Sequence, residues 1–75
     1  MGKKTRKLSN NLRELRQSHG GMTQLDLANR VGITRQTVIA IEANRYSPSL
    51  EVAFMIARTL GVGIEDVFQF GGDAG

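Results

Sequence analysis

Residues 23–42 constrain the fold most, because they carry the signals of two short helices joined at one glycine. Thr23 is a good N-cap, and Asp26, three residues later, is the acidic half of a capping box. Gly32 stands where the end of the first helix favours positive φ, and Thr34 is placed to cap the second. Together with the apolar spacing, these signals predict helices over residues 24–31 and 35–43.

The second of these helices has polar side chains in its first turn. Arg35 and Gln36 are residue types that can bond two atoms of one base edge in the major groove, and Thr37 follows them. A helix that enters the groove by its N-terminus uses these positions for base contact. The pattern therefore indicates a helix-turn-helix that binds DNA, and an ordinary helical hairpin with a polar surface is the alternative.

Charge is divided unevenly along the chain. Residues 1–48 contain nine Lys or Arg against three Asp or Glu, a formal net charge of +6, whereas residues 49–75 contain one Arg against four acids, or −3. The basic part includes the candidate reading helix, as expected of a polyanion-binding face. We interpret residues 1–7 as a flexible basic arm, which either contacts DNA or is a solvated tail.

Other classes of protein are disfavoured. The 75 residues make one small domain without cysteine, and no apolar run is long enough to span a bilayer. We expect no membrane partner and a cytoplasmic location, nucleoid-associated when the protein is bound to DNA. His19 has no ligand-spaced Cys, Asp or Glu beside it, so we expect no metal site. We also expect no cofactor, no small-molecule ligand and no enzymatic activity.

The rest of the chain predicts three further helices and no strand. They are expected at residues 9–19 with Ser9 as cap, at 50–60 after Ser49, and at 64–68. The helix at 50–60 has an apolar stripe expected to face the core: Leu50, Ala53, Phe54, Ala57 and Leu60.

Four segments of this chain, LRELRQ, TQLDLANRVGITRQTVIAIE, SPSLEVAFMIARTLGV and IEDVFQF, resemble the phage-repressor and Cro-like (xenobiotic-response-element type) regulators, especially their compact single-domain prokaryotic members. The resemblance covers residues 8–70 and leaves 71–75 as a frayed tail. It implies an all-α, five-helix repressor-like DNA-binding domain with the helix-turn-helix at its second and third helices.

The function implied by the resemblance is sequence-specific binding of double-stranded DNA as a transcriptional regulator. A homodimeric repressor on a pseudo-palindromic operator is the favoured form. Two alternatives stay open: an antitoxin-like or anti-repressor module that binds protein, and a nonspecific nucleic-acid binder.

The resemblance also assigns contacts by position. Base contacts are expected from Arg35, Gln36, Thr37 and Ala40, the last through its methyl group alone. Backbone contacts are expected from Gln24, Thr34, Asn44, Arg45 and Tyr46. For Tyr46, a half-buried aromatic ring that covers the loop is an equal alternative.

Two structural roles complete the prediction. Arg16 and Glu42 match an ion pair that links the first helix to the end of the third, although Gly20-Gly21 adds a residue between them relative to the family. Candidate dimer contacts are apolar residues expected to be exposed: Phe70, Val52 and Met55. On a helical wheel, the last two lie opposite the predicted core stripe.

Overall fold

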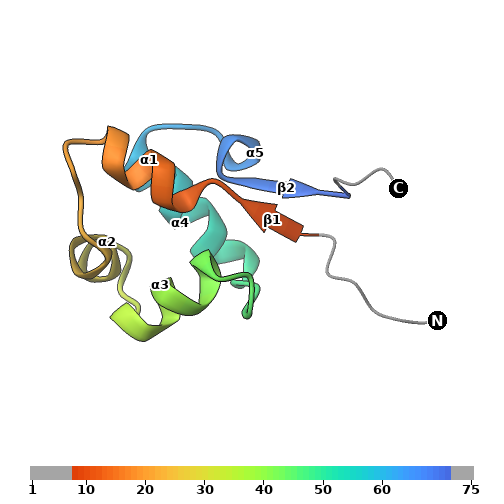
Figure 1. Cartoon of the computed structure of the whole chain (residues 1–75), viewed down its shortest axis with the longest axis horizontal. Helices are drawn as coiled ribbons and strands as arrows, with labels where there is room; N and C mark the ends of the chain where they lie inside the picture. Colours follow the sequence, from red (N-terminus) through yellow and green to blue (C-terminus); the bar gives the residue numbers. More distant parts are fainter. Residues whose placement is uncertain (1–7, 72–75) are drawn as a thin grey trace.

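The computed structural model describes residues 8–71, which form five helices and one small sheet (Figure 1). In chain order the elements are β1 (Leu8–Asn10), α1 (Leu12–Ser18), α2 (Gln24–Val31), α3 (Arg35–Glu42), α4 (Leu50–Leu60), α5 (Ile64–Val67) and β2 (Phe68–Phe70). The predicted five-helix architecture is confirmed, with α2 and α4 at the expected bounds and α3 one residue shorter. The basic arm and most of the predicted frayed tail, residues 72–75, lie outside the described part.

The prediction of no strand is wrong. β1 and β2 pair antiparallel, with Leu8 opposite Phe70 and Asn10 opposite Phe68. As a result α1 begins at Leu12 rather than at residue 9, and α5 ends one residue earlier than predicted. Each strand has only three residues, and the two strands come from opposite ends of the domain's sequence. Pairing over that separation depends on tertiary context and leaves no local periodicity to read.

The N-terminus of α1 also differs from the expectation. Ser9 lies in β1 and is exposed, so it caps no helix. The side-chain oxygen of Asn10 instead accepts a hydrogen bond from the Leu12 N–H at 3.0 Å. Asn11 occupies the N-cap position, and its N–H donates to the Val67 carbonyl at 2.9 Å. Two consecutive asparagines therefore join the first helix to the rest of the fold.

The predicted signals of the helix-turn-helix are present. Thr23 Oγ1 accepts from the Asp26 N–H at 2.9 Å, and Asp26 Oδ2 accepts from the Thr23 N–H at 3.2 Å, which completes the capping box. Gly32 ends α2 with φ of 88°, a conformation that costs a residue with a side chain about 1 kcal/mol or more. Thr34 caps α3 by accepting from the Thr37 N–H at 3.1 Å.

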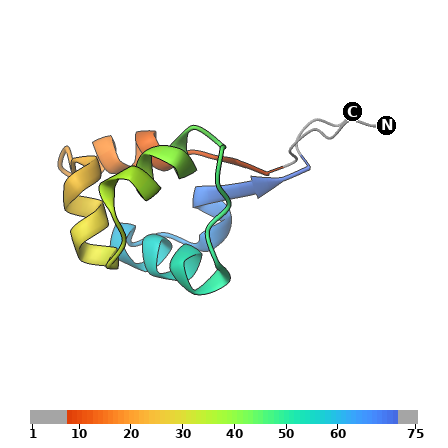
Figure 2. The same ribbon diagram turned by 90° about the horizontal axis from the view of Figure 1, so that it is seen from below.

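The hydrophobic core lies where α1, α2, α3, α4 and α5 meet. α2 packs against α3 and α4, and α4 packs against α5 (Figure 2). The largest fully buried side chains come from all five helices: Leu12, Leu27, Val38, Ile41, Ile56 and Val67. In the described residues, no helix has the length and apolarity needed to cross a bilayer.

The predicted core stripe of α4 is wrong in part. Ala53, Ala57 and Leu60 are buried, but Leu50 and Phe54 are 69% and 48% exposed. Ile56 is fully buried in their place. In a helix so rich in apolar residues, more than one face satisfies helical spacing, and packing against α2 and α5 selects between them. α4 therefore exposes apolar side chains toward solvent.

Candidate nucleic-acid interface

α3 lies along one edge of the molecule, with α2 beside its N-terminal end (Figures 1 and 2). Val38 and Ile41 are buried on its inner side. Arg35 and Gln36, in its first turn, are exposed. This division follows from helical spacing, which places residues three apart on one face. The structure thus exposes the N-terminal turn of α3, with the two side chains expected to read bases, on a rigid support.

The two threonines of this turn are bonded to each other. Thr34 Oγ1 and Thr37 Oγ1 lie 2.9 Å apart, in addition to the cap contact between Thr34 and the Thr37 N–H. Thr37 and Ala40 are half-buried. Their predicted contacts with DNA, and that of Thr34, stay predictions. The observed role of the threonine pair is to order the start of α3.

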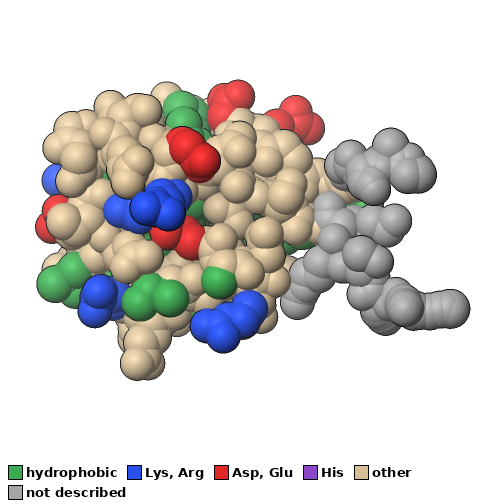
Figure 3. All heavy atoms as spheres, in the orientation of Figure 1, with side chains coloured by type: hydrophobic (Ala, Val, Ile, Leu, Met, Phe, Trp, Pro, Cys, Tyr) green, Lys and Arg blue, Asp and Glu red, His purple; other side chains and the backbone are tan. Residues whose placement is uncertain are grey.

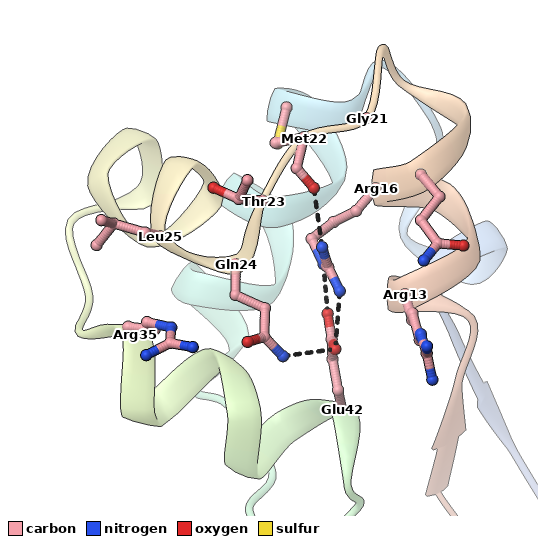
Figure 4. A pocket seen from close by; sticks show the side chains of 10 residues that line it. Arg13, Arg16, Gly21, Met22, Thr23, Gln24, Leu25, Arg35 and Glu42 are labelled. Atoms are coloured by element: carbon pink, nitrogen blue, oxygen red, sulfur yellow. Dashed lines mark hydrogen bonds and ion pairs between the residues drawn. The ribbon is translucent and has the colours of Figure 1, made fainter.

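One buried ion pair connects α1 to the end of α3. Arg16 Nε lies 2.6 Å from Glu42 Oε2, and Nη2 donates to Oε1 at 3.1 Å. The two side chains are only 9% and 10% exposed. Arg16 Nη1 also donates to the Met22 carbonyl at 2.8 Å (Figure 4). The double glycine lies in the turn between α1 and α2, where Gly20 and Gly21 both adopt positive φ, and the pair forms despite the added residue.

Gln24 joins the same carboxylate from α2. Its Nε2 donates to Glu42 Oε1 at 3.1 Å, so α1, α2 and α3 meet at one side chain (Figure 4). The resemblance assigns Gln24 to a phosphate contact, and the structure shows a partner that fixes the position of its amide. Within the described residues, no buried side-chain nitrogen or oxygen lacks a hydrogen-bond partner, so this network is fully satisfied.

A cleft of about 480 Å³ lies over this network, between α1 and the N-terminal ends of α2 and α3. Arg13 and Arg35 stand on opposite sides of it (Figure 4). Because Glu42 is paired with Arg16, the two outer arginines give the cleft a positive excess, which suits an anion such as a DNA phosphate. Arg13 was missed from sequence. The available signal was its place in α1, one turn before Arg16.

The loop after α3 is held by the protein itself. Asn44 has φ of 59°, and its Oδ1 accepts from Asn10 Nδ2 at 2.9 Å. Arg45 is exposed and Tyr46 is 50% exposed. Tyr46 borders a small cleft together with Pro48. The contacts with the DNA backbone predicted for Asn44, Arg45 and Tyr46 stay predictions.

Charge on the visible face follows the division in the sequence. In Figure 3, basic side chains lie over α1 and along α3 with some acidic side chains between them, and further acidic side chains lie at the edge near α5. α5 carries Glu65 and Asp66 in its first turn. Among residues 8–71, no three His, Cys, Asp or Glu side chains cluster in a way that could hold a metal ion.

The predicted dimer contacts differ in how far they are exposed. Phe70 and Met55 are 80% and 38% exposed. Val52 is half-buried and packs against the core, so its predicted place opposite the core is wrong. A different apolar surface is present near the sheet, where a cleft of about 290 Å³ is bordered by six side chains: Leu8, Pro48, Leu50, Ala53, Ile64 and Phe68.

Comparison with known sequences gives consistent matches. A family model described as helix-turn-helix matches residues 12–67. An uncharacterized HTH-type transcriptional regulator of Methanocaldococcus jannaschii is 48% identical over 66 residues, covering 88% of this chain and 98% of that protein. One from Methanothermobacter thermautotrophicus is 63% identical over 49 residues, covering 64% and 71%. The HTH-type regulator YgzD of Bacillus subtilis is 44% identical over 61 residues, covering 81% and 91%.

Solved structures agree with these matches. The clp gene regulator ClgR from Corynebacterium glutamicum superposes with a TM-score of 0.68 at 25% identity, covering 73% of this chain and 57% of that one. The hypothetical transcription factor NHTF from Neisseria also gives 0.68, at 32% identity, covering 75% and 63%. This chain spans less than two thirds of each of these two proteins, so only their common part is comparable.

Proposed function

Because this chain belongs to the Cro/C1-type helix-turn-helix family of DNA-binding transcriptional regulators, we propose that it acts as a repressor that binds a pseudo-palindromic operator as a homodimer. The observation that carries the proposal is the exposed first turn of α3 above a buried three-helix network. A repressor of this kind acts by occupying its operator and excluding polymerase.

Base reading is proposed for the first turn of α3. Arg35 is suited to the O6 and N7 acceptors of guanine, and Gln36 to the N6 and N7 atoms of adenine. Ala40, one turn farther along, is suited to contact a thymine methyl group. Rigid support favours discrimination, because a side chain held at a fixed angle loses binding energy when the base edge changes.

Phosphate contacts are proposed on both sides of the reading turn. Arg13 and Gln24 border the cleft between α1 and α2, and Arg45 follows the C-terminal end of α3. The N-terminus of α2 adds backbone N–H groups and a favourable helix dipole. Contacts of this kind set register on the duplex without reading sequence, and they make affinity depend on salt.

A second copy of the chain is the proposed partner at the sheet. Phe70 is largely exposed at the end of β2, close to the apolar cleft that Leu8, Ile64 and Phe68 border. Exposed aromatic residues next to an apolar cleft are typical of interface cores. A two-fold pairing at this end of the molecule would carry two α3 helices into successive major grooves, about 10 base pairs apart.

Selection of bound duplexes from a random DNA library, near physiological salt, tests the proposal. We expect a pseudo-palindrome with half-sites about 10 base pairs apart. Recovery of half-sites without symmetry would contradict the homodimer and leave base reading intact. Recovery of no motif, with weak binding that salt abolishes, would contradict specific regulation altogether.

A further inference from the structure

Asn10 makes three hydrogen bonds that connect distant parts of the chain. Its Oδ1 accepts from the Leu12 N–H at 3.0 Å, at the start of α1. Its Nδ2 donates to the Ile41 carbonyl and to Asn44 Oδ1, each at 2.9 Å. The residue is half-buried in β1, opposite Phe68 of β2. One amide group thus links the sheet, α1 and the end of α3.

The acceptors of Asn10 lie where the helix ends and the candidate DNA-backbone loop begins. The Ile41 carbonyl also accepts from the Asn44 N–H at 2.9 Å, and the Arg45 N–H donates to the Ala40 carbonyl at 2.9 Å. The last carbonyls of a helix have no partner within the helix, and the end frays unless the following chain or a group from elsewhere in the fold holds them. Here the following chain supplies the backbone bonds, and Asn10 adds one bond to Ile41 from a distant part of the sequence.

Asn44 is the residue that turns the chain. It is the only non-glycine residue with positive φ in the described part of the chain. Asparagine tolerates this conformation better than most residues, and a fixed side-chain bond favours it further. Asn10 therefore contacts both the last turn of α3, through Ile41, and the residue that turns the chain toward Arg45.

We propose that Asn10 is a positioning residue for DNA binding, which holds the end of α3 and the loop Asn44–Tyr46 in the orientation that places them against the DNA backbone. The inference rests on the proposed function, since it assigns a task in operator binding. It also joins the sheet, where the second copy is proposed to bind, to the loop on the DNA side. Loss of Asn10 therefore acts on DNA affinity without removing any DNA contact.

Two neighbouring asparagines provide a matched pair of variants. Asn10→Asp keeps an oxygen that can accept from the Leu12 N–H. It removes the amide nitrogen that donates to the Ile41 carbonyl of α3 and to Asn44 Oδ1. Asn11→Asp adds the same charge one residue away, but the side chain of Asn11 donates to the Asp66 carbonyl of α5 at 3.3 Å and has no bond to α3. Charge repulsion from DNA is therefore similar in the two variants. Their difference reports the link to α3.

Two measurements on the full chain test the inference. The first is amide hydrogen exchange of the protein without DNA. The exchange rates of the α2 amides in each variant serve as the reference for changes in global stability. For Asn10→Asp we expect exchange at Asn44 and Arg45 to be about tenfold faster than for Asn11→Asp, as for the loss of one hydrogen bond of ordinary strength. The second is affinity for the selected operator, which should fall about fivefold or more below that of Asn11→Asp.

The other possible results of these two measurements contradict the proposal. Equal exchange in the two variants, or faster exchange with equal operator affinity, would overturn the positioning role. If the wild-type chain prefers no duplex, the proposed function itself has failed and the inference fails with it. Should Asn10→Asp not fold, Asn10→Ser keeps a side-chain oxygen at the start of α1 and removes the amide donor to Ile41 and Asn44. Faster exchange at Arg45 in that free variant supports the inference, and unchanged exchange contradicts it.

Discussion

Arg16 of α1 and Glu42 of α3 form a two-point contact across 26 residues of sequence, with Nε 2.6 Å from Oε2 and Nη2 donating to Oε1. The same carboxylate accepts from Gln24, so one acidic side chain connects α3 to both α1 and α2. A buried pair of this type is costly to break from one side, because the remaining charge keeps little compensation.

Glu42→Ala should therefore destabilise the fold strongly. It leaves the Arg16 guanidinium buried with the Met22 carbonyl as its remaining acceptor in the structure, and we expect a loss of about 3 kcal/mol in the free energy of unfolding. Urea denaturation measures it. Glu14→Ala, which removes an exposed acid from α1, should change stability by about 0.5 kcal/mol or less. Equal losses in the two variants would show that the pair contributes nothing beyond a surface charge.

Gly32→Ala should destabilise through the backbone alone. A Cβ at this glycine would meet no atom within 4 Å, but its φ of 88° is unfavourable for alanine. We expect a loss of about 1–2 kcal/mol. Gly63→Ala is the matched control: its φ is −79° and its Cβ would reach Asp66 Oδ2 at an ordinary 3.4 Å. Thermal unfolding compares them, and a Gly63→Ala variant as unstable as Gly32→Ala would contradict this account.

Arg13→Ala should weaken binding to all duplexes together. If this arginine contacts a phosphate, the slope of log affinity against log salt should fall by about 1, with base preferences unchanged. Titration at several salt concentrations measures the slope. Arg58→Ala removes the same charge from the exposed side of α4 and should leave the slope nearly constant. A change in base preference with Arg13→Ala would assign that residue a reading role instead.

Phe70→Ser should disrupt the proposed dimer. The ring is 80% exposed in the single chain, so its loss should change stability of the monomer little while removing an anchor of the interface. We expect the apparent mass in analytical ultracentrifugation to fall toward that of one chain. Leu25 is 51% exposed and borders the cleft over the Arg16–Glu42 pair, far from Phe70 in the sequence. Leu25→Ser should therefore keep the wild-type mass. A stable dimer of Phe70→Ser at micromolar concentration would refute the assignment.

Local signals account for what the sequence predicts well. Thr23, Asp26 and Gly32 act on neighbours within a few residues, so their pattern identifies the helix and its ends. The Arg16–Glu42 pair is not local, and only the family resemblance indicated it. The part that could not be predicted depends on partners far apart in the chain.

The sheet and the role of Asn10 belong to that second part. Neither a three-residue strand nor a single amide has a sequence pattern of its own, and both depend on how the ends of the domain meet. The face of α4 was ambiguous for another reason. Leu50 and Ile56 are equally apolar, and only packing decides which one the core accepts.

We propose that α3 reads bases through its first turn. The most direct test of this proposal is the affinity of wild type and Arg35→Ala for the selected half-site and for every single-base change within it. We predict that Arg35→Ala loses roughly 1–3 kcal/mol of discrimination at one or two adjacent positions and keeps the rest. A uniform loss at all positions would show that Arg35 contacts only the backbone, and it would contradict base reading by this residue.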